Sequence, residues 1–171
     1  MMSTDKIKLE EGRKKLKQLV KEIKVAMMIT SLGQKPLSAV PMFTKKIQDD
    51  GIIWFLSSST SEHNENLEKQ NEMQLLYSDP SGMKFLSVYG RAEIIKDQEV
   101  LKDLYNPKTD AWFSGPEDPN LTAIKFTSTD AHFWSPKSNK YISLLKLAGA
   151  AINGEKQDIG EQGSIKLQDS K

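Results

Sequence analysis

The chain has 171 residues, 37% of them hydrophobic and 27% charged, which suits one domain with a buried core. Its 24 Lys and Arg balance 23 Asp and Glu, so overall charge draws the chain neither to nucleic acid nor to an anionic membrane. The absence of Cys excludes disulfides, thiolate metal sites and a Cys nucleophile. No N-terminal apolar run marks a signal peptide and no stretch has the length of a membrane helix, so we expect a cytoplasmic protein.

The N-terminal segment, residues 1–24, is predicted to be helical. Leu16, Leu19, Val20 and Ile23 recur at helical spacing and place one apolar stripe on a charged helix from about residue 9 to 24. This stripe should cover a core.

The region 25–135 has the pattern of a barrel. Its predicted strands, rich in β-branched and aromatic residues, are 25–31, 37–43, 51–56, 73–78, 83–95, 121–129 and 131–134. Gly and Pro between the first two strands predict a hairpin, and Gly90 suggests a bulge or bend. Short helices are expected at about 62–70 and after Asp97, which has the chemistry of an N-cap.

The C-terminal part divides into two segments. Residues 136–155 keep helical spacing and end at Asn153-Gly154, whereas residues 156–171 carry few apolar side chains and are expected to form a loose tail. The sum is a single, mainly β domain over 1–171. Its six or seven antiparallel strands close into a small barrel with flanking helices, because closure removes exposed strand edges.

Four phrases of the sequence carry a family resemblance. They are DGIIWFLSSSTSEHNENLEKQNEMQLLYSD (50–79), FLSVYGRAEIIKDQEVLKDLY (85–105), DAWFSGPEDPNLTAIKFTSTDAHFW (110–134) and NGEKQDIGEQGSIKL (153–167). In this order they resemble the general stress protein branch of the pyridoxamine 5′-phosphate oxidase-like, FMN-binding split-barrel superfamily. The resemblance implies a split β-barrel, a homodimer, and FMN at the subunit interface, with its ring touched by residues of both subunits.

The hydroxyl-rich junction at residues 57–61 is where the resemblance places the FMN phosphate. It assigns the hydroxyls of Ser57, Ser58 and Ser61 to the phosphate, with the start of the following helix as a further source of donors. Relatives add an Arg on the second strand, but Val40 occupies that position here.

The basic residues expected beside these hydroxyls are also replaced. Ser61-Glu62-His63 stands for a Ser-basic-basic run, so His63 is the group at this position that can become cationic. Lys45, Lys46 and Lys84 are the alternative cations.

The junction has a second interpretation that involves no ligand. Ser59-x-x-Glu62 fits a capping box, and an acidic residue in a first helical turn suits the helix dipole. The sequence alone leaves anion site and helix cap as alternatives.

The resemblance also assigns aromatic and apolar residues to the flavin ring. Trp112 and Trp134 correspond to aromatic residues near the interface, and Met42 and Phe55 would line the pocket. The alternative for both Trp residues is ordinary core or dimer packing, and inward-facing barrel residues line an interior by default.

Three functions fit this sequence. The first is an FMN-dependent oxidoreductase that passes a hydride or electron pair between NAD(P)H or a quinone-like partner and a small molecule. The second is a non-catalytic flavin-binding or storage module, and the third is a dimeric split barrel without cofactor, because the phosphate-binding cations are replaced. No residue stands out as a catalytic acid or base, so the catalytic residues stay unassigned.

Two further patterns narrow these functions. Lys140 and Ile142 stand where pyridoxamine-phosphate oxidases carry a substrate-binding Arg and His, which argues against oxidation of a B6 vitamer. His63 and His132 lie far apart in a chain without Cys, so no metal site is expected.

Overall fold

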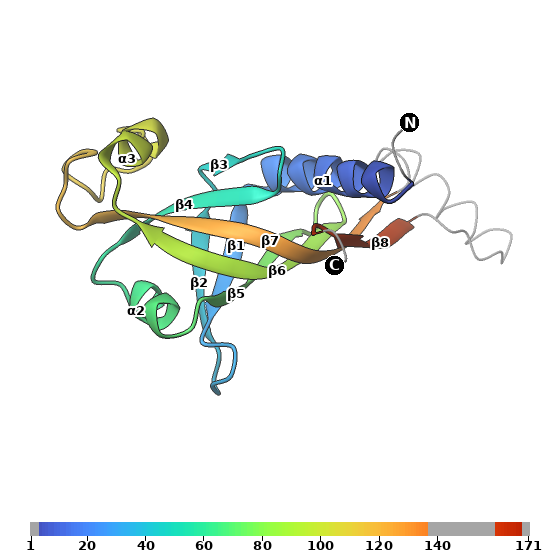
Figure 1. Cartoon of the computed structure of the whole chain (residues 1–171), viewed down its shortest axis with the longest axis horizontal. Coiled ribbons are helices and arrows are strands. Elements are labelled where there is room, and N and C mark those ends of the chain that lie inside the picture. The colour runs from blue at the N-terminus through green and yellow to red at the C-terminus, as the bar shows by residue number, and fades with distance from the viewer. Residues whose placement is uncertain (1–3, 137–159, 169–171) are drawn as a thin grey trace, which may run out of the picture.

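The computed structural model describes residues 4–136 and 160–168, which form a curled antiparallel sheet with helices against it (Figure 1). The helices of this part of the chain are α1 (Thr4–Ile23), α2 (Glu62–Lys69) and α3 (Gln98–Leu104). The strands are β1 (Val25–Thr30), β2 (Ser38–Phe43), β3 (Lys46–Ile47), β4 (Ile52–Ser58), β5 (Glu72–Asp79), β6 (Lys84–Ile95), β7 (Leu121–Pro136) and β8 (Gly160–Lys166). The predicted mainly β split barrel is confirmed.

The sheet has the strand order β2-β1-β5-β6-β7-β4-β3, and every neighbouring pair is antiparallel. The long strand β7 pairs with β4 through its first half and with β8 through its second half. β4 and β8 therefore lie end to end along the same edge of β7. Strands β2 and β3 end the order, so the barrel is open between them.

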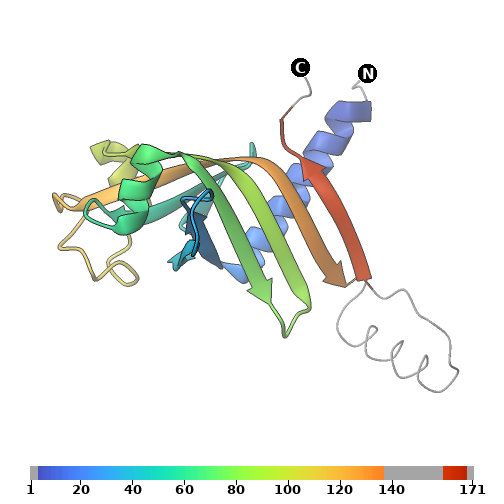
Figure 2. The same cartoon turned by 90° about the horizontal axis from the view of Figure 1, so that it is seen from below.

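The main core lies on the inner side of this curled sheet. Alternate residues of the strands point inward, among them the fully buried Met28, Leu75 and Phe126. The apolar stripe of α1 packs onto the same core through Leu16 and Leu19, as its spacing predicts. Figure 2 shows α1 running across the sheet beside β8. No helix in residues 4–136 and 160–168 has the length and apolar content needed to cross a membrane.

A smaller core lies on the outer side of β4 and β7. There Leu101 and Leu104 of α3 cover apolar residues of both strands: Trp54 and Leu56 on β4, and Leu121 and Ala123 on β7. Asp97 caps α3 by accepting hydrogen bonds from the backbone N–H of the second and third helical residues, so the predicted N-cap is confirmed.

The structure corrects the sequence analysis at the C-terminus. Residues 160–166 form β8 and pair with β7, so the prediction of a loose tail is wrong for this segment. The segment is held by backbone pairing and by Ile165 and Leu167, which are buried in the main core. The predicted helical segment 136–155 lies outside the described residues, apart from Pro136, which ends β7.

Gly90 lies at the predicted irregularity, where the register of β6 against β7 shifts between Tyr89 and Gly90. A Cβ atom at this position would lie 2.1 Å from the backbone oxygen of Thr127 and 2.9 Å from the ring of Phe126. The absence of a side chain therefore lets β6 and β7 approach each other at the bulge.

Replacing Gly90 with Ala should lower the free energy of unfolding by about 1–3 kcal/mol, because backbone atoms must move to admit the methyl group. Urea denaturation followed by circular dichroism measures this change. Gly33→Ala is the matched control, since a Cβ there meets nothing within 4 Å, and its effect should stay within about 0.5 kcal/mol. Equal losses in the two variants would contradict the proposed close approach.

Candidate functional site

The hydroxyl-rich junction connects the end of β4 to the start of α2 (Figure 1). Ser57 is the last inward-facing residue of β4 and lies opposite Thr122 on β7. Both side chains are buried, as is Asn64 in the first half of α2. These three polar residues meet beneath the helix.

Their hydrogen bonds form a closed group. The Ser57 hydroxyl donates to Oδ1 of Asn64 at 2.7 Å, and Nδ2 of Asn64 donates to the Thr122 hydroxyl at 2.8 Å. The Thr122 hydroxyl in turn donates to the backbone oxygen of Ser57 at 3.0 Å. Because a hydroxyl has one hydrogen, neither Ser57 nor Thr122 keeps a donor for a phosphate.

Ser61 and Ser58 make local contacts at the start of α2. Ser61 is the N-cap of α2, and its hydroxyl accepts from the backbone N–H of Asn64 at 3.3 Å. The Ser58 hydroxyl lies 3.0 Å from that of Thr60. The capping box predicted from Ser59 is therefore wrong by two residues, and the backbone N–H of Ser59 donates instead to the oxygen of Asn120.

The other residues assigned to this end belong to the barrel interior. Phe55 is fully buried in the main core, and Val40 and Met42 of β2 are partly buried against that core. Val40 thus contributes an apolar surface at the position where the resemblance predicts a cation.

Each alternative cation is bound to a carboxylate. Lys46 Nζ lies 2.8 Å from Asp103, and Lys84 Nζ lies 2.6 Å from Glu22. Lys45 Nζ lies 2.6 Å from Asp110, and this pair is nearly buried, with side-chain exposures of 8% and 10%. Breaking a buried pair costs about 3–5 kcal/mol. A charged hydrogen bond to phosphate returns about 1.5–3 kcal/mol, so Lys45 stays where it is.

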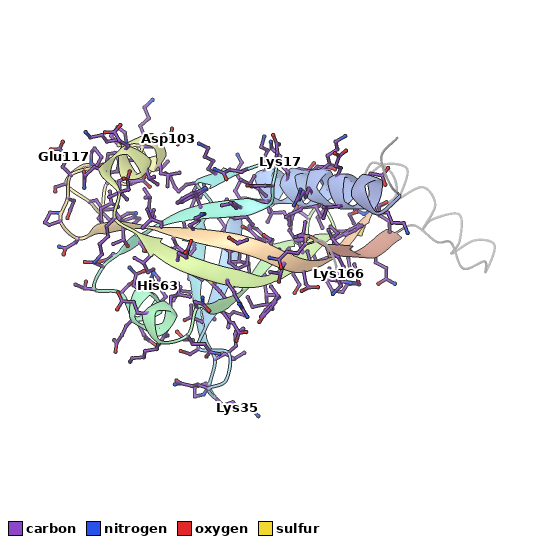
Figure 3. All side chains as sticks on the ribbon, in the orientation of Figure 1. Lys17, Lys35, His63, Asp103, Glu117 and Lys166 are labelled. Atoms are coloured by element: carbon purple, nitrogen blue, oxygen red, sulfur yellow. The ribbon has the colours of Figure 1, made fainter. Side chains whose placement is uncertain are left out.

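His63 lies on α2 and is half-buried (Figure 3). Its Nε2 atom is buried and has no hydrogen-bond partner within the described part of the chain. Burial lowers the pKa of His63, with Glu62 acting weakly in the opposite direction. The ring is therefore neutral at pH 7 and adds no positive charge to the junction.

Trp134 lies far from the junction, near the other end of β7. From Thr122, beside Ser57, to Trp134 is about 40 Å of strand at roughly 3.3 Å per residue. Trp134 is 43% exposed and faces Phe85 on β6. It borders an open hollow of about 410 Å³ whose other walls are Met83, Phe85, Ser135, Pro136, Gly160, Glu161 and Gln162.

Trp134 also belongs to a wider apolar surface that the sequence analysis missed. Large apolar side chains stand exposed on the outward positions of five adjacent strands, and we call this set the outer apolar face: Val25, Met27, Phe43, Leu76, Phe85 and Trp134. Cross-strand pairing connects members of this set: Val25 on β1 faces Phe43 on β2, and Met27 on β1 faces Leu76 on β5. The signal was present in VAMM and QLLY, because strands apolar on both sides are covered on both sides.

Trp112 is joined to neither group. It lies in the segment between α3 and β7 and is 88% exposed. The structure thus separates the predicted site residues into a buried group at the junction, an exposed group around Trp134, and Trp112 by itself. Asn64 and Thr122, which close the junction, were not predicted. Residues 4–136 and 160–168 contain no cluster of His, Asp or Glu side chains that could bind a metal ion.

Comparison with known families identifies this architecture. The sequence model described as pyridoxamine 5′-phosphate oxidase like matches residues 11–158. General stress protein 26 of Bacillus subtilis is 24% identical over 139 residues, which cover 79% of this chain and 96% of that protein. Protein bli-3 of Neurospora crassa is 23% identical over 126 residues, and the match covers 68% of this chain but 60% of bli-3.

Solved structures show the same fold. A general stress protein 26-like protein of Jannaschia sp. CCS1 superposes with a TM-score of 0.73 at 24% identity, covering 94% of this chain and 98% of that one. The general stress FMN/FAD binding protein of Xanthomonas citri has a TM-score of 0.63 at 25% identity, covering 75% and 90%.

Replacing Asn64 with Ala should lower the free energy of unfolding by about 2–4 kcal/mol, because two buried hydroxyls lose their partner. Glu68→Ala, an exposed change on the same helix, is the control and should stay within about 0.5 kcal/mol. Chemical denaturation provides both values. If Asn64→Ala behaves like the control, the buried group does not hold α2 in place.

Proposed function

The chain belongs to the pyridoxamine 5′-phosphate oxidase-like family, and from this premise we propose that it is a homodimeric flavin-binding protein whose flavin ring lies between the two subunits. The observation that carries the proposal is the exposure of the outer apolar face together with Trp134. A flat, largely apolar ring is favoured by such aromatic walls. The name of the Xanthomonas citri relative, an FMN/FAD binding protein, supports the same ligand class.

A second copy of the chain is the occupant that best suits the outer apolar face. The face crosses five strands, and Met27, Leu76 and Phe85 are each more than one third exposed. Monomeric proteins rarely leave a continuous surface of this kind in water. Covering it with an identical face buries the same residues twice, as in a two-fold symmetric interface.

The separation along β7 supports the same arrangement. The junction at Ser57 and the aromatic surface at Trp134 are about 40 Å apart along the strand, longer than a flavin can bridge. In Figure 3 His63 on α2 lies well apart from Lys166 on β8, the strand that pairs with the second half of β7. Both groups can contact one flavin when the junction comes from one subunit and Trp134 from its partner.

The reaction that we propose is electron transfer, with NAD(P)H or a quinone-like molecule as one partner and a small molecule as the other. When bound, flavin supplies the hydride-transfer chemistry itself, so the protein needs to orient the ring and its partner. No acid or base beside the ring is required for this hydride transfer.

Two other functions are possible for the same dimer. It could hold flavin without catalysing a reaction, or it could bind no flavin. The observation that favours them is the junction, where the buried hydroxyls of Ser57 and Thr122 are already bound to protein groups and Lys45 and Lys46 are paired with carboxylates. An absorbance spectrum and its response to NAD(P)H distinguish these functions from an oxidoreductase.

Purified protein mixed with flavin and passed through a desalting column should keep flavin absorbance in the visible range. NADPH or NADH should bleach that absorbance if the protein is an oxidoreductase and leave it unchanged if the protein stores flavin. Trp134→Ala should weaken flavin retention by about tenfold, because stacking against one aromatic ring is worth about 1–1.5 kcal/mol. No retained flavin under any condition leaves the dimer without cofactor as the function.

Leu76→Asp should convert the dimer into a monomer of 19.3 kDa in analytical ultracentrifugation, because a carboxylate would be buried at the centre of the interface. Leu37→Asp is the control, since Leu37 is 53% exposed but precedes β2 outside the paired strands. A wild-type chain that sediments as a monomer rules out the proposed interface.

A further inference from the structure

This inference rests on the proposed function and concerns the end of the ligand that lies at the junction. We propose that the junction accepts an uncharged group, so that the protein binds riboflavin, the flavin without a phosphate, at least as tightly as FMN. The apolar Val40 and the closed hydroxyl group of Ser57, Asn64 and Thr122 are the features that select against a phosphate dianion.

Cations that could reach the junction are already neutralised or point elsewhere. Lys45 and Lys46 are bound to carboxylates in the ion pairs above, and Lys84, paired with Glu22, lies beside Phe85 at the Trp134 end of the sheet. On α2 itself Lys69 lies in the last turn, 2.6 Å from Glu65. Arg91 alternates with the buried Gly90 and Ala92 on β6, the strand that α2 contacts, and so faces the outer side of the sheet.

The helix start keeps part of its attraction for an anion, but its own side chains oppose it. Backbone N–H groups at the N-terminus of α2 favour negative charge. The N–H of Asn64 is already bound to Ser61, and the exposed carboxylate of Glu62 occupies the first turn. A phosphate at this position would face that carboxylate and a neutral His63.

An alcohol suits these surroundings better than a phosphate. The hydroxyls of Ser58, Thr60 and Ser61 keep free lone pairs, and Thr60 is exposed. A ribityl hydroxyl can donate to such lone pairs, whereas a phosphate dianion brings only acceptors. The junction therefore offers the phosphate no free cation in the ion pairs above, and the two flavins differ there in the group at the end of the same chain.

The test compares riboflavin and FMN on the full chain by quenching of flavin fluorescence, at low and at high salt. A phosphate–cation contact is worth about tenfold or more in affinity. We expect the riboflavin dissociation constant to be equal to that of FMN or lower, and FMN binding to be insensitive to salt. The inference is overturned if FMN binds at least about tenfold more tightly than riboflavin and its binding weakens with salt. That result leaves the proposed function standing. Absence of binding by either flavin overturns both.

Variants that restore positive charge sharpen the comparison. Val40→Arg with His63→Lys should tighten FMN binding by about tenfold or more and leave riboflavin binding unchanged. Val40 packs against the core, so Val40→Arg could disturb folding. Glu62→Lys adds positive charge at an exposed position in the first turn of α2 and leaves that packing intact. Gln18→Arg on α1, which lies apart from α2 in Figure 1, adds the same positive charge as Val40→Arg and should change neither affinity. Equal tightening of both flavins by Glu62→Lys would refute the assignment of the phosphate end to the junction.

Discussion

The buried amide of Asn64 is the contact on which the arrangement of this site depends. An amide side chain that is removed from water must satisfy both its oxygen and its nitrogen, and here the hydroxyls of Ser57 and Thr122 do so from two adjacent strands. This requirement fixes α2 over the end of β4 and the start of β7. It also consumes the hydroxyl donors of Ser57 and Thr122, so the same contact that holds the helix removes two donors from a phosphate.

Strand and helix positions could be predicted because they depend on local patterns. The stripe beginning at Leu16, the irregularity at Gly90 and the cap at Asp97 each follow from spacing or from the chemistry of one residue. β8 could not be predicted in this way, because GEQGSIK is polar and gains its strand structure from pairing with β7. Its stability comes from a partner far away in the sequence.

The site was harder to predict than the fold, since its chemistry depends on which partner each polar group finds. Three Ser residues near α2 could all have capped the helix, and the burial of Asn64 decided in favour of Ser61. Lys45 and Asp110 are 65 residues apart, and nothing in either local sequence shows that they pair. Resemblance to a family gave the correct architecture, but it could not show that the hydroxyl donors of Ser57 and Thr122 are already used.

The length of β7 sets how a ligand can be shared in the proposed dimer. One end of the flavin would lie at the junction of one subunit, and its ring would lie on Trp134 of the partner, so the two ends contribute separately to binding. An aromatic group of this size buries about 150–250 Å², worth about 5 kcal/mol at roughly 25 cal/mol per Å². A single cation–phosphate contact is worth about 1.5–3 kcal/mol. Burial of the ring is therefore the larger contribution to the binding free energy. The lack of cations at the junction should affect the preference between flavins, while the buried ring still provides most of the affinity.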